Sequence, residues 1–122
     1  MKRYLLPMVF ALVLAGCDQA PKIDGTSIES TKYSLEKVNE PLTPEKRKEL
    51  DTALNAIGEY SNLETFSLRK GGDRAASNRM LLAILNNKTA DEIIAEAEKL
   101  KPKTEARKKK LEDEAKAMST EK

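Results

Sequence analysis

The thiol of Cys17 has the most distinctive chemistry in this sequence, because Cys17 is the only cysteine among 122 residues. As a thiolate, cysteine is a nucleophile that can be modified, oxidised or joined to a second cysteine. With one cysteine, no disulfide can form within the chain. The sequence also has no histidine, so neither a Cys–His nor a Ser–His–Asp arrangement can exist.

The residues before Cys17 have the three parts of a secretory signal. The chain begins with two basic residues after Met1, residues 5–14 are apolar apart from one proline, and two small residues follow. The run from residue 4 to residue 17 holds 14 residues, whereas a membrane-spanning helix needs about 20. We therefore expect residues 1–16 to be a cleaved signal peptide rather than a permanent transmembrane helix.

Residues 14–17, Leu-Ala-Gly-Cys, resemble the lipobox of bacterial lipoproteins. The resemblance implies a diacylglycerol on the Cys17 sulfur, cleavage before Cys17 and acylation of the new amino group, with fatty chains such as palmitate. Each buried methylene contributes about 0.8 kcal/mol, so two or three chains hold a protein on a membrane far more firmly than one. The alternative is an ordinary cleavage that leaves Cys17 as a free thiol.

Asp18 directly follows this cysteine and bears on which membrane holds the protein. In lipoproteins of enteric bacteria, an aspartate at this position retains the protein in the inner membrane. The favoured location is therefore the inner membrane, with the domain facing the periplasm. The outer membrane is the alternative, and Asp18 would then be only a polar residue of the tether.

The composition of the mature chain argues against several classes of function. Removal of residues 1–16 lowers the number of basic residues from 22 to 20, which equals the number of acidic ones. A net charge of zero, with no aromatic residues among the basic clusters, does not favour nucleic-acid binding. The lack of histidine removes the usual general base and the usual zinc ligand. We expect no enzyme activity, no metal and no cofactor.

Hydrophobic spacing and capping residues predict the elements that follow the anchor. Residues 17–26 comprise the lipidated cysteine and a tether without periodicity, whose nine residues average about 15–18 Å end to end when flexible. Apolar residues at helical spacing predict a first helix from residue 27 to just before Pro41. The sequence Thr-Pro-Glu at 43–45 predicts the start of a second helix over 44–60.

Two further helices are predicted in the second half of the chain. Asp73 suits the N-cap of a helix over about 74–86, and the apolar run Met80–Leu85 predicts that this helix is the most buried element. Residues 89–92 form a capping box for a fourth helix, which Pro102 is expected to end.

The expected fold class is all-α, with one bundle of about four helices over residues 27–102. Residues 103–122 are nearly all charged and offer few apolar side chains for burial. Glu105 and Lys109 are among the pairs spaced for favourable contacts on one helix face. We therefore expect a solvated, charged tail that is helical or disordered.

Two basic segments are candidate binding sites. Arg69, Lys70, Arg74 and Arg79 surround a pair of glycines before a predicted helix start, and amides in that setting can bind a phosphate or a lipid headgroup. This segment is not a P-loop, and a solvated turn is the alternative. Residues 101–110 form the second segment, which fits an anionic membrane, peptidoglycan or an acidic partner, with a solvated charge run as the alternative.

Four segments together resemble a family of small Gram-negative lipoproteins that carry a domain of unknown function. They are the lipobox, the tether Pro-Lys-Ile-Asp at 21–24, the helix start Leu-Thr-Pro-Glu-Lys at 42–46, and the block from Asn87 to Glu98. The resemblance covers roughly residues 15–100. Most of its positions are caps or core residues, so it implies a shared fold and no particular activity.

These observations predict a non-catalytic lipoprotein that has the membrane and an unknown envelope protein as partners, without indicating an oligomeric state. It would serve as an envelope structural or protein-interaction module. One alternative is a small inhibitor or immunity-type lipoprotein. Another is a carrier of an apolar or anionic ligand, for which a pocket beside Met80–Leu85 is expected.

Overall fold

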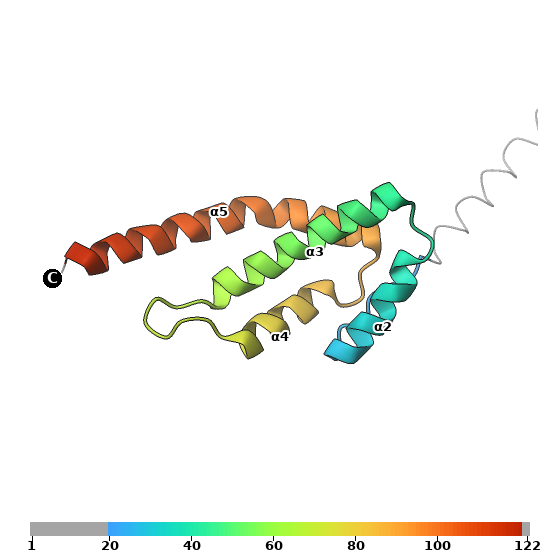
Figure 1. Cartoon of the computed structure of the whole chain (residues 1–122), viewed down its shortest axis with the longest axis horizontal. Helices are drawn as coiled ribbons and strands as arrows, with labels where there is room; N and C mark the ends of the chain where they lie inside the picture. The colour runs from blue at the N-terminus through green and yellow to red at the C-terminus, as the bar shows by residue number, and fades with distance from the viewer. Residues whose placement is uncertain (1–19, 121–122) are drawn as a thin grey trace, which may run out of the picture.

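The computed structural model describes residues 20–120. This part of the chain has no β-strand, only an isolated bridge between Ser67 and Gly71. The predicted all-α fold is therefore confirmed. The predicted signal peptide 1–16, with Cys17 and Asp18, lies outside the described residues. The described residues form four helices, α2 (Ile28–Asn39), α3 (Pro44–Thr65), α4 (Arg74–Leu85) and α5 (Ala90–Thr120), as drawn in Figure 1.

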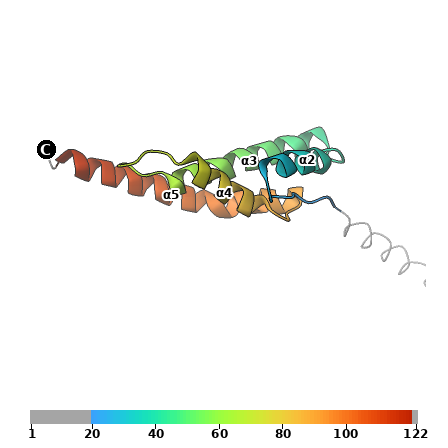
Figure 2. The same cartoon turned by 90° about the horizontal axis from the view of Figure 1, so that it is seen from below.

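Helices α3 and α5 lie side by side and run in the same direction (Figure 1). An ion pair of 2.9 Å joins Lys46 to Asp91 near the starts of the two helices, and another of 2.7 Å joins Glu59 to Lys108 further along. Helix α4 returns between them in the sequence and packs against α3. In the turned view of Figure 2, α5 again runs alongside α3 and extends past its end.

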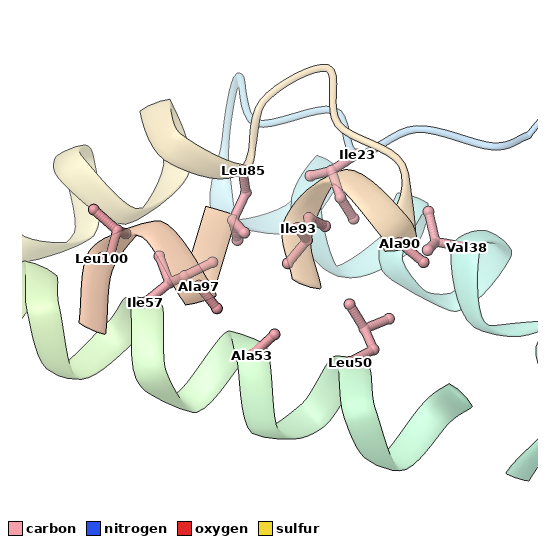
Figure 3. Close-up of a cluster of buried hydrophobic side chains, with 10 residues drawn as sticks. All are labelled: Ile23, Val38, Leu50, Ala53, Ile57, Leu85, Ala90, Ile93, Ala97 and Leu100. Atoms are coloured by element: carbon pink, nitrogen blue, oxygen red, sulfur yellow. The ribbon is translucent and has the colours of Figure 1, made fainter. Parts of the chain in front are cut away.

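The core lies where α2, α3, α5 and the end of α4 meet (Figure 3). Leu50, Ile57 and Ile93 are completely enclosed, and Val38 of α2 closes one end of the cluster. Full burial of such a side chain contributes about 1.5–3 kcal/mol, so this cluster is the main source of stability. The buried apolar residues are Ile23, Val38, Leu50, Ala53, Ile57, Leu85, Ala90, Ile93, Ala97 and Leu100.

The predicted helix starts are confirmed by the caps. The Thr43 hydroxyl accepts the Lys46 amide, and Pro44 occupies the first position of α3. The Asp73 carboxylate accepts the Ala76 amide at the start of α4. At the start of α5, the Thr89 hydroxyl accepts the Glu92 amide, and the Glu92 carboxylate accepts the Thr89 amide. These caps satisfy amides that the first turn leaves without partners.

Helix α4 is not the most buried element, and this prediction was wrong. Within Met80–Leu85 only Leu85 is buried, and Ala83 is exposed. The reason is its position: α4 packs chiefly against α3 and lies on the side of α3 away from α5 (Figure 1). An apolar run on a helix at the edge of a bundle can bury only one face.

Pro102 does not end α5, contrary to the prediction, since the helix continues to Thr120. A proline inside a helix lacks the amide hydrogen that the carbonyl four residues earlier would accept. Here Leu100 and Thr104, two positions before and two positions after the proline, are both buried. Arg107, one turn further on, is bonded to α3. These tertiary contacts keep the chain helical past the proline.

The expected flexible tether is shorter than predicted, because the chain joins the core at Ile23. This side chain is 2% exposed. Its amide donates to the Lys88 carbonyl oxygen at 2.9 Å, and its carbonyl oxygen accepts the Asn87 amide at 2.8 Å. The next residue, Asp24, donates its amide to the Ser34 hydroxyl. Residues 23–26 therefore belong to the folded domain.

Candidate functional site: the groove between α3 and α5

A groove runs along the seam of α3 and α5, and all its lining residues belong to these two helices. Its larger part has a volume of about 460 Å³. A second part of about 330 Å³ continues it toward the end of α3, and Ala56, Ala97 and Lys101 line both parts. The complete lining is Glu45, Lys48, Glu49, Thr52, Ala53, Ala56, Glu59, Ile94, Ala97, Glu98, Lys101, Thr104 and Glu105.

Short side chains on the floor create the groove. Ala53 and Ala56 of α3 face Ala97 of α5 across the seam, and Ile94 adds apolar surface beside them. Ala53 and Ala97 are buried, whereas Ala56 and Ile94 are partly exposed. Because an alanine extends only one carbon from the backbone, the two helices pack closely yet leave a channel above their contact. The channel can hold apolar side chains of another molecule.

Charged side chains form the rim, and acidic ones are in excess. Five glutamates line the groove, at positions 45, 49, 59, 98 and 105, against two lysines, Lys48 and Lys101. Lys101 already pairs with Glu98 at 2.7 Å. Lys108, just outside the lining, bonds Glu59 at 2.7 Å, and this hydrogen bond raises the pKa of Lys108 above its ordinary value. The groove thus has an apolar floor and a predominantly anionic rim.

The predicted basic cluster lies elsewhere. Arg69 and Lys70 are exposed on the loop between α3 and α4, and Arg74 and Arg79 are exposed on α4. The Asp73 carboxylate already accepts an amide at the start of α4, where an anion was expected. In Figure 1 this loop lies toward the left, away from the start of the described chain at the right. An anion site formed by these four residues stays a prediction.

Arg107 has a role that the sequence analysis missed. Its guanidinium Nε donates to the Leu63 carbonyl oxygen at 3.0 Å, and an Nη donates to the Phe66 carbonyl oxygen at 2.9 Å. These acceptors lie at the end of α3, where carbonyls lack the usual helical partners; the Leu63 oxygen also accepts the Phe66 amide at 3.4 Å. The basic run 107–110 suggested only solvated charge or an external partner, because the acceptors lie more than 40 residues away.

The structure gives other predicted residues plain roles. Glu92 belongs to the cap of α5, and its bonds from Thr89 lower the pKa of the carboxyl below its ordinary value. None of Met80–Leu85 lines the α3–α5 groove, so the pocket expected for a carrier is not this one. Across residues 20–120, three or more potential metal ligands do not cluster at any point. In the same range, no helix has the length and apolar character to cross a membrane.

A known family model matches most of the chain. The model of a family of unknown function, DUF6694, matches residues 3–102. Every residue that lines the larger part of the groove lies within this range, whereas the end of α5 lies beyond it. No curated protein and no solved structure matches.

Proposed function

Because the chain belongs to DUF6694, a family of unknown function, we propose its role from its own residues. It is a lipid-anchored, non-catalytic module that binds another protein at the surface of a cell-envelope membrane. The anchor is Cys17, and the binding surface is the α3–α5 groove. The location that Asp18 favours is the periplasmic face of the inner membrane.

The anchor is supported by the lipobox-like residues 14–17 after an apolar run. Because Ile23 is buried in the domain, only a short segment separates the domain from the anchor. Six residue steps separate Cys17 from Ile23, and a fully extended chain spans at most about 3.6 Å per residue. Ile23, where the folded domain begins, therefore lies within about 22 Å of Cys17. A protein held so close to a bilayer meets membrane-bound partners far more often than free ones, because its effective concentration there is high.

The groove is the observation that carries the binding role. It combines an apolar floor with a charged rim, which is the arrangement of protein-binding surfaces, where a buried apolar centre is surrounded by polar residues. Its larger part lies on the first half of α3 and the first part of α5. These are the parts of the two helices nearest to the start of the described chain (Figure 1), which supports a groove that lies close to the proposed anchor.

Palmitate labelling tests the anchor. Cells that produce the full chain are fed an alkyne analogue of palmitate, and the labelled protein is compared between wild type and Cys17→Ala. We expect label and detergent-dependent extraction for wild type, and neither for the variant. Unlabelled wild-type protein that high salt releases from membranes would remove the anchor from this proposal.

Crosslinking in cells tests the binding role and separates it from the alternative of a small inhibitor. For an interaction module, a short amine-reactive crosslinker should trap the same envelope protein repeatedly in unstressed cells. For an inhibitor or immunity-type lipoprotein, deletion should sensitise cells to one agent and leave unstressed growth unchanged. The second result without the first would favour the inhibitor.

A further inference from the structure

The groove has the dimensions of a helix-binding site. From Glu45 to Glu59 its lining spans 14 residue steps of α3, which corresponds to about 21 Å at 1.5 Å per residue. That length matches a partner helix of about four turns. Helices pack with axes about 8–10 Å apart, and the smaller distances need small residues at the contact. Ala53, Ala56 and Ala97 supply them.

One side of the α3–α5 pair is already covered, whereas the groove side is open. Ile23, α2 and the end of α4 complete the core around Leu50, Ile57 and Ile93. The bond from Ser77 of α4 reaches Asn62, which is not part of the groove lining. Within residues 20–120, only α3 and α5 contribute to that lining. A helix placed in the groove would complete a layer that this chain leaves open.

The charge of the rim selects the kind of helix. Glu45 and Glu49 lie on the α3 side, and Glu49 is 3.9 Å from Lys46, whose stronger partner is Asp91 at 2.9 Å. Glu45 forms no ion pair with another residue between 20 and 120. On the α5 side, Lys101 is engaged by Glu98, and Lys108 is shared by Glu59 and Glu105. Lys48 lines the groove without an ion pair among residues 20–120 and offsets one glutamate. With Lys46 engaged by Asp91, the carboxylates still outnumber the lysines around the apolar floor, so the net charge there is negative.

Three other occupants are disfavoured by the same charge. A second copy that met this groove symmetrically would place one anionic rim against the other, which costs energy in a desolvated contact. Anionic lipid headgroups and nucleic acids carry the same sign as the rim and would be repelled. A basic peptide would associate faster because of the anionic rim, and the rim charges would fix its register along the groove.

We infer that the α3–α5 groove binds a basic amphipathic helix of a partner protein. Small or medium apolar side chains of that helix lie over Ala56 and Ile94, the partly exposed apolar residues of the lining, and flanking lysine or arginine side chains meet the rim glutamates. This inference rests on the proposed function and names the chemistry of the partner that the anchored module binds.

A photocrosslinking amino acid at the groove tests the occupant in cells. The full, lipidated chain carries the photoreactive residue at Thr52, an exposed position of the groove lining, or at Ala83, an exposed position of α4 that serves as the control. Mass spectrometry identifies the linked peptide. We expect a product at Thr52 and not at Ala83, joined to a segment with helical apolar spacing and an excess of lysine and arginine.

Four other outcomes would contradict the inference. Absence of a Thr52 product, an acidic or non-helical linked segment, a dimer of this chain, or a lipid adduct would each overturn it. None of these outcomes affects the palmitate test, and an acidic linked partner would leave the binding role intact. The two proposals can therefore fail separately.

Charge reversal on the rim provides the second measurement. The double variant Glu45→Lys with Glu49→Lys should lower the yield of the Thr52 product about tenfold or more, because like charges then face the basic helix. The matched control reverses Glu112 and Asp113, which are exposed on α5 outside the groove. Circular dichroism checks that both variants remain helical. Equal crosslinking in the two double variants would show that the rim charge does not select the partner.

Discussion

The guanidinium of Arg107 donates a hydrogen bond of 3.0 Å to the carbonyl oxygen of Leu63, across 44 positions of sequence. A second bond reaches the Phe66 carbonyl oxygen. Together they attach α5, beyond Pro102, to the end of α3. The same side chain thus caps the C-terminal end of α3 and holds α5 against it. This relationship explains why α5 stays helical where its sequence predicts a stop.

Replacing Arg107 with alanine should destabilise the domain and loosen the end of α5. Hydrogen bonds that involve a charged group contribute about 1.5–3 kcal/mol, so we expect a loss of that size in urea unfolding. Amide exchange in residues 103–120 should rise more than exchange in the core. Lys109→Ala, an exposed change on the same helix, is the control. Equal effects of the two variants would mean that Arg107 does not hold α5 in place.

Replacing Ile23 with alanine should lower stability by about 2–4 kcal/mol, because it removes buried apolar volume and leaves a cavity. The matched control is Ile28→Ala, which makes the same chemical change at a side chain that is 44% exposed. Thermal unfolding of the soluble domain measures both. A loss no larger than that of the control would show that the segment after the anchor is not part of the core.

Two glycines should respond in opposite ways to alanine. A Cβ at Gly25 would collide with the Leu82 carbonyl oxygen and lie 2.9 Å from the Asn86 Cβ, so Gly25→Ala should be destabilising. At Gly58, inside α3, a Cβ would meet nothing within 4 Å. Gly58→Ala should therefore stabilise the helix by about 0.5–1 kcal/mol. Chemical denaturation of both variants checks the signs, and a stabilising Gly25→Ala would contradict this packing.

Stability should fall at acid pH partly because of Glu92. Its carboxylate accepts the Thr89 amide, which lowers the pKa of Glu92 from the ordinary value of 4.5. A carboxyl with a lowered pKa contributes stability above its unfolded value and loses it as the pH falls through the folded value. The contribution should therefore be present at pH 6 and be lost progressively as the pH falls below about 4.5 and through the lowered pKa of the folded state.

Midpoints of thermal unfolding between pH 7 and pH 3 measure this effect. Glu92→Gln should lower the midpoint of thermal unfolding at pH 6. The difference in midpoint between this variant and wild type should become smaller as the pH falls. Glu112→Gln, an exposed change near the end of α5, serves as the control. A difference between wild type and Glu92→Gln that does not change with pH would exclude the cap carboxylate as its source.

Local signals in the sequence predicted the helix starts well. Three helix starts are indicated directly by Thr43 with Pro44, by Asp73, and by Thr89 with Glu92, because a cap depends on residues within one turn. The predicted end of α3 at residue 60 is too early, because Gly58 weakens a helix and residues 61–72 lack regular apolar spacing. In the structure α3 continues to Thr65, with Ser61 fully buried against the core. Packing there outweighs propensity.

The candidate site could not be predicted in the same way. Ala53 and Ala97 fall within apolar stripes at helical spacing in the sequence, but a stripe does not reveal whether a third element covers it. The sequence alone does not show which lysine or arginine of residues 101–110 has a partner within the chain. In the structure Lys101, Arg107 and Lys108 have different partners, and those partners lie up to 49 positions away.

The sequence by itself determined the helical class, the caps, and the lipobox-like signal that predicts an anchor at Cys17. Each of these depends on neighbouring residues. Only the tertiary structure decided that Ile23 belongs to the core, that α5 passes Pro102, and that α3 and α5 leave a groove between them. The physical reason is that burial, long-range hydrogen bonds and open surface depend on which segments meet, and that arrangement is a property of the whole packed chain.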